Sequence, residues 1–227
     1  MEEKINILDL NLDCVTVKNA MIQAIQFLDS DSIDTIEIIS MNTLMEQRED
    51  EGWKKLAGEL TMLLPGEAEI LRAADISDRT KLKEAEEGTF LKMFIKYLEK
   101  KRKNVYILAE SKEEFLKTRN LLRNRNRGIR FSGYSVLDPQ EAREENVINE
   151  INGTETDCIL SVLHTPYQEE FISRNKALLN VRVWLGCGAV FAQQYENKGP
   201  AGRLKHFLQK KLFWYRVEHQ NKEEQGR

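Results

Sequence analysis

The sequence predicts an α/β domain with a Rossmann-like, mostly parallel sheet flanked by helices. Short β-rich runs alternate with longer stretches of helical periodicity, a pattern typical of parallel strands joined by crossover helices. The chain contains no internal repeat and no low-complexity linker. Its 227 residues are enough to bury a sizeable core, and they suit one large domain or one domain with an appendage.

Seven runs carry the strand pattern, at residues 4–8, 35–40, 61–64, 104–109, 129–132, 157–162 and 181–186. The clearest helix lies between the third and fourth runs, where apolar side chains recur at helical spacing: Phe90, Leu91, Phe94, Ile95 and Leu98. Similar but weaker stripes predict helices near residues 115–122 and 171–179.

Composition excludes several classes of protein. Hydrophobic residues make up 41% and charged residues 31%, which indicates a soluble globular chain. The net charge of −3 points to no polyanionic partner, and no apolar stretch approaches the roughly 20 residues that span a bilayer. The acidic start MEEKINILDL does not resemble a signal peptide. Three scattered cysteines fit a reducing cytosol and neither a disulfide framework nor a zinc site.

Composition changes once, near Lys198. Residues 198–216 contain six Lys or Arg and no acid, and one helical face carries Leu204, Phe207, Leu208 and Leu212. Such a helix can lie on an anionic membrane surface, or it can dock on the body with its cations in water. Periodicity alone leaves both alternatives open. We therefore divide the chain into a Rossmann-like domain, 1–197, and a basic amphipathic tail, 198–227.

Ligands of open parallel sheets bind beyond the carboxyl ends of the strands. Candidate site residues should therefore follow strands directly, at 40–42, 65–69, 163–169 and 186–188. A structure that brings them together should place Ser40, Asn42, Glu67, Gln168 and Gly188 around one cleft.

Six short motifs occur in a recognisable order: INIL at 5–8, Ser40-Met41-Asn42, Leu64-Pro65-Gly66-Glu67, the turn from His164 to Glu169, Gly186-x-Gly188-x-x-Phe191, and Phe213-Trp214-Tyr215-Arg216. Each is weak alone. In this order and spacing, the chain resembles the WecG/TagA/CpsF family of bacterial glycosyltransferases from end to end.

The resemblance implies transfer of an N-acetylhexosamine-type sugar from a UDP donor to a lipid-linked, polyprenyl-diphosphate acceptor. Such enzymes serve cell-surface polysaccharide or teichoic acid assembly at the cytoplasmic face of the membrane. The family's basic tail contacts membrane and helps to close the active site, which favours membrane contact for 198–216. We expect an inverting enzyme without a metal or other cofactor, because no cluster of strand-end carboxylates is present to hold a cation. We expect no nucleic-acid partner, and self-association is left open.

The chain departs from the family where chemistry would be expected. Gly66 occupies the place of the Asp proposed as the family's general base, and Ala192 replaces another Asp. The family's Arg and Asp are absent around Gly88, and Leu212 stands near the place of a family Glu. Sugar transfer needs a base for the acceptor hydroxyl. Glu67, one residue further on, is the candidate; its alternative role is a first-turn helix acid.

The other candidate site residues also have structural alternatives. Gln168 and Glu169 match the family in type, but they could simply start a helix after Pro166. Ser40 and Asn42 could bind substrate or cap the next helix. Two glycines of the Gly-x-Gly stretch, Gly186 and Gly188, are also predicted to bind substrate. Arg203 and Arg216 could stabilise diphosphate charge as bidentate donors, or they could simply be solvated charges.

Two further functions compete with an active transferase. The lost Asp favours a catalytically weakened relative that binds a nucleotide sugar or a partner transferase. The basic stretch 121–130 could contact RNA phosphates, but it lacks interleaved aromatic residues. Asp29-Ser30-Asp31 has the spacing of a metal–nucleotide motif, yet it precedes a strand and so belongs to the wrong edge of the sheet.

Overall fold

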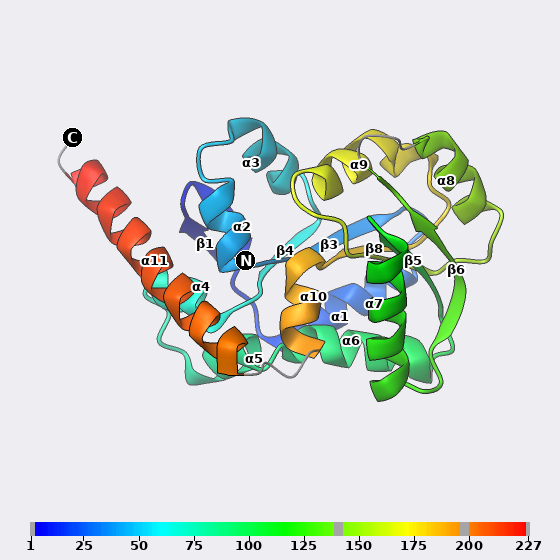
Figure 1. Ribbon diagram of the computed structural model, residues 1–227, viewed down its shortest axis with the longest axis horizontal. Helices are drawn as coiled ribbons and strands as arrows, with labels where there is room; N and C mark the ends of the chain where they lie inside the picture. The colour runs from blue at the N-terminus through cyan, green and yellow to red at the C-terminus, as the bar shows by residue number, and fades with distance from the viewer. Residues whose placement is uncertain (1–2, 139–142, 196–199, 226–227) are drawn as a thin grey trace.

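A computed structural model describes residues 3–138, 143–195 and 200–225 (Figure 1). The strands are β1 (Lys4–Ile7), β2 (Leu10–Asp13), β3 (Asp34–Ile39), β4 (Met62–Pro65), β5 (Asn104–Ala109), β6 (Arg130–Val136), β7 (Cys158–Ser161) and β8 (Val183–Gly186). The helices are α1 (Val17–Leu28), α2 (Met41–Glu46), α3 (Glu51–Gly58), α4 (Ala68–Ala73), α5 (Arg79–Glu86), α6 (Thr89–Lys100), α7 (Lys112–Arg125), α8 (Glu144–Asn152), α9 (Tyr167–Asn175), α10 (Gly188–Tyr195) and α11 (Pro200–Gln225). A short 3₁₀ turn, η1 (Lys176–Leu178), follows α9.

The main sheet of the described chain has six strands in the order β4-β3-β8-β7-β5-β6, and every neighbouring pair is parallel. Strands β7 and β8 are buried along their whole length. Such continuous burial is expected of strands that are covered on both faces. The predicted Rossmann-like α/β class is confirmed.

Helices cover both faces of this sheet (Figure 1). One face packs against α1, α6, α7 and α10 in a cluster that includes Ile36, Phe94 and Leu185. The other face packs against α8 and α9 around Trp184 and Phe171, whose rings stack with centroids 5.8 Å apart. The predicted stripe from Phe90 to Leu98 is the buried face of α6.

The first predicted strand does not belong to the main sheet, which corrects the sequence interpretation. β1 pairs antiparallel with β2, a strand that the sequence analysis missed, in a separate two-stranded sheet. Leu8 and Asp9 form the two-residue turn between them, and both have positive φ, 52° and 62°. Two such residues give a turn whose twist matches a hairpin. Because neither residue is Gly or Asn, the usual sequence signal for this turn is absent.

Helix α11 docks on the part of the molecule built from the hairpin and α2 to α4 (Figure 1). Phe213 is fully buried and Val217 is 6% exposed, and both belong to a cluster with Leu12 and Met41. The predicted apolar face of this helix does not dock; its members are exposed: Leu204, Phe207, Leu208 and Leu212. The buried side of α11 agrees with the docking alternative, and membrane contact by the exposed side stays a prediction. The division of the chain at residue 197 stays a prediction.

The strand order contains a switch point between β5 and β7. These strands are neighbours, but β5 leads through α7 to β6 on one side, while β7 leads through α9 to β8 on the other. Diverging connections leave a crevice at the carboxyl ends of such strands, where open α/β sheets bind ligands.

Candidate functional site

The predicted site residues lie at the carboxyl edge of four neighbouring strands. Ser40 follows β3, Glu67 follows β4, Gln168 lies beyond β7, and Gly188 lies beyond β8. The structure brings them to one edge of the sheet but separates them into two groups. One group surrounds Glu67 and the other surrounds Gln168.

Glu67 is tied to the start of a neighbouring helix. Its Oε1 accepts a 2.9 Å hydrogen bond from the backbone N–H of Met41, the first residue of α2. A carboxylate at this position satisfies a helix N–H that has no partner within the helix, and it is favoured by the helix dipole. Glu67 is also the residue before α4, but its side chain does not cap that helix. With 7% of its surface exposed, Glu67 is a buried acid.

The tail helix covers the same region. His206 Nδ1 of α11 lies 3.6 Å from Glu67 Oε2, and Lys210 Nζ lies 2.7 Å from Glu69 Oε1. Arg72 Nη1 is also 2.7 Å from Glu69 Oε1. The two acids of the Pro65–Glu69 loop thus contact cationic or titratable side chains of α11. The role of Glu67 as a base stays a prediction, and these contacts favour a structural role for its carboxylate.

The loop before Glu67 is closed against β3 at Gly66. Its N–H donates a 2.7 Å hydrogen bond to the carbonyl of Ile39. A Cβ at position 66 would lie 2.7 Å from that same backbone oxygen and 3.1 Å from side-chain atoms of Ile38 and Val190. The glycine is needed for this close approach, because a backbone atom cannot turn aside as a flexible side chain can. An Asp side chain therefore does not fit here without a shift of the loop.

The second group is buried beneath the edge. Gln168 is 2% exposed, and a Cβ at Gly186 would lie 2.8 Å from its Nε2, so the glycine makes room for this amide. Glu169 is fully buried and accepts a 2.8 Å hydrogen bond from Thr165 Oγ1. The buried side chains of Gln168 and Glu169 therefore stabilise the carboxyl edge of the sheet from inside the protein.

Glu169 meets a second buried acid, Glu37, in the middle of β3. Desolvation raises the pKa of Glu37 well above its ordinary value, and the nearby charge of Glu169 raises it further. Glu169 accepts a hydrogen bond from Thr165 and lies in the first turn of α9, where the helix dipole favours an anion. A protonated Glu37 donates a hydrogen bond to it.

Ser40 acts as a helix cap. Its Oγ accepts a 3.1 Å hydrogen bond from the N–H of Thr43, and only 1% of the residue is exposed. Asn42 is half-buried in the first turn of the same helix. Capping is thus the observed role of Ser40, in line with the structural alternative.

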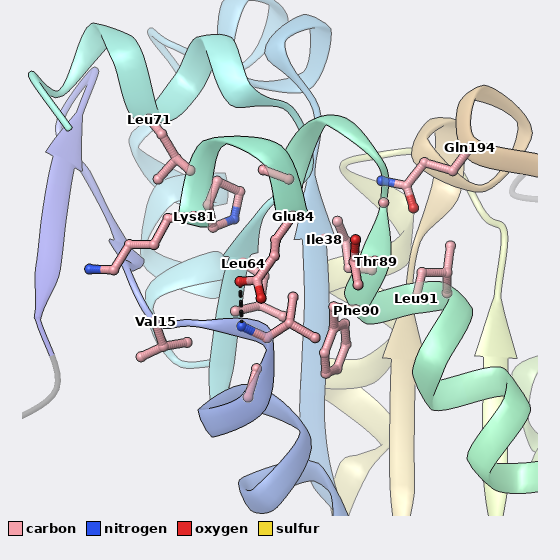
Figure 2. A pocket seen from close by; sticks show the side chains of 15 residues that line it. Val15, Ile38, Leu64, Leu71, Lys81, Glu84, Thr89, Phe90, Leu91 and Gln194 are labelled. Atoms are coloured by element: carbon pink, nitrogen blue, oxygen red, sulfur yellow. Dashed lines mark hydrogen bonds between the residues drawn. The ribbon is translucent and has the colours of Figure 1, made fainter. Parts of the chain in front are cut away.

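A small cavity lies beside the end of β4, between α1, α5 and the start of α6 (Figure 2). Its walls are mostly apolar, and Glu84, Lys81 and Gln194 bring polar groups to it. Glu84 already accepts the N–H of Val17 at 2.9 Å. The cavity volume is about 40 Å³, which is far below the roughly 300–1,000 Å³ of ligand sites and holds only a few waters.

A wider cleft of about 520 Å³ opens at the switch point between β5 and β7. Its lining residues are Glu110, Glu144, His164, Thr165, Pro166, Tyr167, Glu170 and Arg174. Arg174 bridges two of these acids, at 2.7 Å from Glu144 and 3.2 Å from Glu170. Burial would raise the pKa of Glu144, but hydrogen bonds from Arg174 and Asn175 outweigh it and lower that pKa.

The two predicted diphosphate partners lie in α11. Arg216 is exposed, and Arg203 belongs to the first turn of the helix, where its side chain lies outside the described residues. Among the described residues, no group of three or more His, Cys, Asp or Glu is placed to hold a metal ion. None of the described helices combines the length and apolar character needed to cross a membrane.

The sequence profile of the glycosyl transferase WecG/TagA/CpsF family matches residues 5–201. The chain belongs to this family. No curated protein matches the chain significantly. Membership of the WecG/TagA/CpsF family implies a glycosyltransferase-like role in cell-surface polysaccharide assembly, with a nucleotide-sugar donor and a lipid-linked acceptor in general terms.

Two acids of this WecG/TagA/CpsF family member were missed in the sequence analysis. Glu110 directly follows β5, so the rule that selected the other strand-end residues would have found it. Glu37 stands alone as an acid within the apolar run IEII of β3, which is an unusual position for a charge. His164 lies in a predicted site loop, but its partner could not be assigned before the order of β5 and β7 was known.

Proposed function

We propose that the chain transfers an N-acetylhexosamine-type sugar from a UDP donor to a polyprenyl-diphosphate-linked acceptor. The observation that carries the proposal is the family match over residues 5–201, which spans every strand of the main sheet. The parallel sheet with its open carboxyl edge supports it, because nucleotide ligands of such sheets bind there.

The turn after β8 supports donor binding on the side of α10. Gly188 opens this helix with φ of 29°, and a Cβ there would lie 3.0 Å from the carbonyl of Leu163. The first turn of α10 contains no acid, so its N–H groups and dipole favour a diphosphate. Arg203 and Arg216 are proposed to add cationic charge from α11.

The exposed side of α11 supports action at the inner face of the cell membrane. Leu204, Phe207, Leu208 and Leu212 are each about half exposed or more, and Lys211 Nζ lies 4.9 Å from the ring of Phe207. Apolar side chains with neighbouring cations suit a surface of anionic lipid. Each cation near such a surface contributes about 1 kcal/mol, and salt weakens the attraction.

A catalytically weakened relative is the second candidate function. Two observations favour it: Gly66 is closed against Ile39, and the carboxylate of Glu67 caps α2. Such a protein would bind a nucleotide sugar or a partner transferase without turnover.

Calorimetric titration with UDP-N-acetylglucosamine and UDP-N-acetylmannosamine, followed by turnover assays with a polyprenyl-diphosphate-linked N-acetylglucosamine in anionic liposomes, tests both candidates. An active transferase binds one donor and turns over, with no loss of binding in EDTA. Binding without turnover supports the weakened relative, and no binding of either donor contradicts both. Removal of residues 198–227 should release the protein from the liposomes, while a truncated chain that still binds them would contradict the membrane role of the tail.

A further inference from the structure

His164 and Glu110 form a dyad across the switch point between β5 and β7. Glu110 Oε2 lies 2.8 Å from His164 Nδ1, and Glu110 Oε1 accepts a 2.7 Å hydrogen bond from the backbone N–H of the same histidine. One carboxylate therefore holds both the ring and the main chain of His164. This two-point contact fixes the position of the imidazole more firmly than a single ion pair would.

The contact also determines which ring nitrogen faces the cleft. Because Nδ1 points at a carboxylate, it carries the proton, and the lone pair of the neutral imidazole is on Nε2. Glu110 is itself held in place, since Glu114 Oε2 accepts its N–H at 3.0 Å. The side chain of His164 is 66% exposed and that of Glu110 is 25% exposed. The carboxylate thus lies deeper and the imidazole lies at the opening of the cleft.

The cleft beside the dyad has the chemistry of a sugar site. Its walls combine the ring of Tyr167, the guanidinium of Arg174 and the carboxylates of Glu144 and Glu170. Planar hydrogen-bonding groups and an aromatic ring can bind hydroxyl groups and the faces of a pyranose. Three carboxylates, of Glu110, Glu144 and Glu170, line this cleft with one guanidinium, and the net negative charge of these walls repels a diphosphate. A neutral sugar is therefore favoured over a nucleotide diphosphate on this side.

We propose that His164 is the general base for the acceptor hydroxyl and that Glu110 is its positioning residue. The proposal rests on the proposed transferase function. The acceptor oxygen bonds to the anomeric carbon of the donor as the bond from that carbon to the diphosphate oxygen breaks. The hydroxyl proton passes to Nε2 of His164, and the diphosphate leaves with the electron pair. Glu110 stabilises the imidazolium that results, as a carboxylate does for the histidine of a catalytic triad.

The position of the dyad agrees with donor binding near α10. The carbonyl of Leu163, the residue before His164, is the atom that a Cβ at Gly188 would meet at 3.0 Å. Glu67 lies much further from His164. Glu67 follows β4, three strands from β7, which is roughly 14 Å at about 4.8 Å per strand. Glu67 and His164 cannot act on the same hydroxyl, so a kinetic comparison separates them.

The kinetic test uses the full chain with both UDP-N-acetylhexosamine donors and the lipid-linked acceptor. His164→Ala should lower kcat by roughly 10²-fold or more with little change in donor KM, and added imidazole should restore part of the rate. Glu110→Gln should lower kcat in the same direction, because one amide oxygen cannot accept both protons of His164. His219→Ala, which removes another exposed histidine, is the matched control. A kcat within threefold of the unaltered chain for His164→Ala would overturn the proposal.

A binding measurement tests the dyad without turnover. In histidine-selective ¹⁵N NMR, His164 should show the Nδ1–H tautomer, and its signals should shift on titration with methyl N-acetylglucosaminide. Glu110→Gln should weaken the tautomer preference, and the His219 signals should not move. If the UDP donors neither bind nor react but His164 responds to the sugar, the transferase proposal fails and the sugar cleft stands. If His164 does not respond while the donors bind, the cleft assignment is wrong.

Discussion

Replacement of Glu37 by Gln should remove a pH dependence from the stability of the protein. In the folded chain, desolvation beside Glu169 keeps the pKa of Glu37 well above its ordinary value, so the group is neutral where a free Glu would be ionised. In the unfolded chain, Glu37 loses its proton near pH 4.3. The folded state then binds more protons than the unfolded state, and the free energy of unfolding must fall as pH rises.

The size of this pH dependence follows from the single proton that Glu37 keeps in the folded state. Stability should fall by about 1.4 kcal/mol for each pH unit above the unfolded pKa, and the fall should level off only when the pH passes the folded pKa of Glu37. Gln at position 37 imitates the protonated acid, because its amide can donate to Glu169. It has no proton to lose. The stability of Glu37→Gln relative to the unaltered chain should therefore grow with pH at that rate.

Urea unfolding at pH 5.5, 6.5 and 7.5 measures this difference. Glu46→Gln, which changes an exposed acid at the end of α2, is the control and should show no comparable trend. If the free energy of unfolding changes with pH in the same way for Glu37→Gln and for the unaltered chain, the reasoning is refuted, because Glu37 would then be ionised in the folded protein. A large loss of stability at all three pH values would show that the amide does not replace the acid in its contacts.

Three further substitutions test the site and the tail. Gly66→Asp should lower the free energy of unfolding by several kcal/mol, because its Cβ would meet the carbonyl of Ile39 at 2.7 Å. The new carboxylate should not raise turnover. A variant that turns over faster and is equally stable in urea would show that the loop at Gly66 has room for a side chain. Phe213→Ala should weaken the docking of α11 by about 3–5 kcal/mol, seen as faster amide hydrogen exchange in that helix, whereas Phe207→Ala should change it by less than about 0.5 kcal/mol; equal exchange in both variants would show that Phe213 does not hold the helix. Glu67→Gln should keep turnover within a few-fold, since the amide oxygen can still cap α2; a loss of roughly 10²-fold with intact donor binding would restore Glu67 as the base.

The fold class was predictable because the signals that carry it are local. Alternation of apolar runs and helical stripes located the strands of the main sheet, and the stripe from Phe90 to Leu98 predicted α6 correctly. The hairpin of β1 and β2 was not predictable in the same way. Its turn at Leu8 and Asp9 uses residue types that seldom adopt positive φ, so the sequence does not mark it.

For the site, the sequence predicted only that its residues lie at the carboxyl edge of the sheet. Strand ends identify which residues reach that edge, but they do not give the order of the strands. Glu110 and His164 are 54 positions apart along the chain, and only the pairing of β5 with β7 makes them partners. The same limit applies to Glu37 and Glu169. Side-chain direction was also beyond reach, since Gln168 follows a strand as predicted yet points into the protein.

The proposed membrane contact of α11 would set a distance between the lipid and the sheet. One side of the helix is fixed to the protein through Lys210 and Phe213, while the apolar side chains project from the other. If the exposed side rests on a bilayer, the helix acts as a spacer, and the protein surface beneath it stands at most one helix diameter, roughly 10–12 Å, above the depth that the apolar side chains reach. An acceptor whose first sugar lies directly against the headgroups would be too short to reach the strand ends. The thickness of a single helix would then set the minimum length of an acceptor, counted from its phosphates, that can reach the protein.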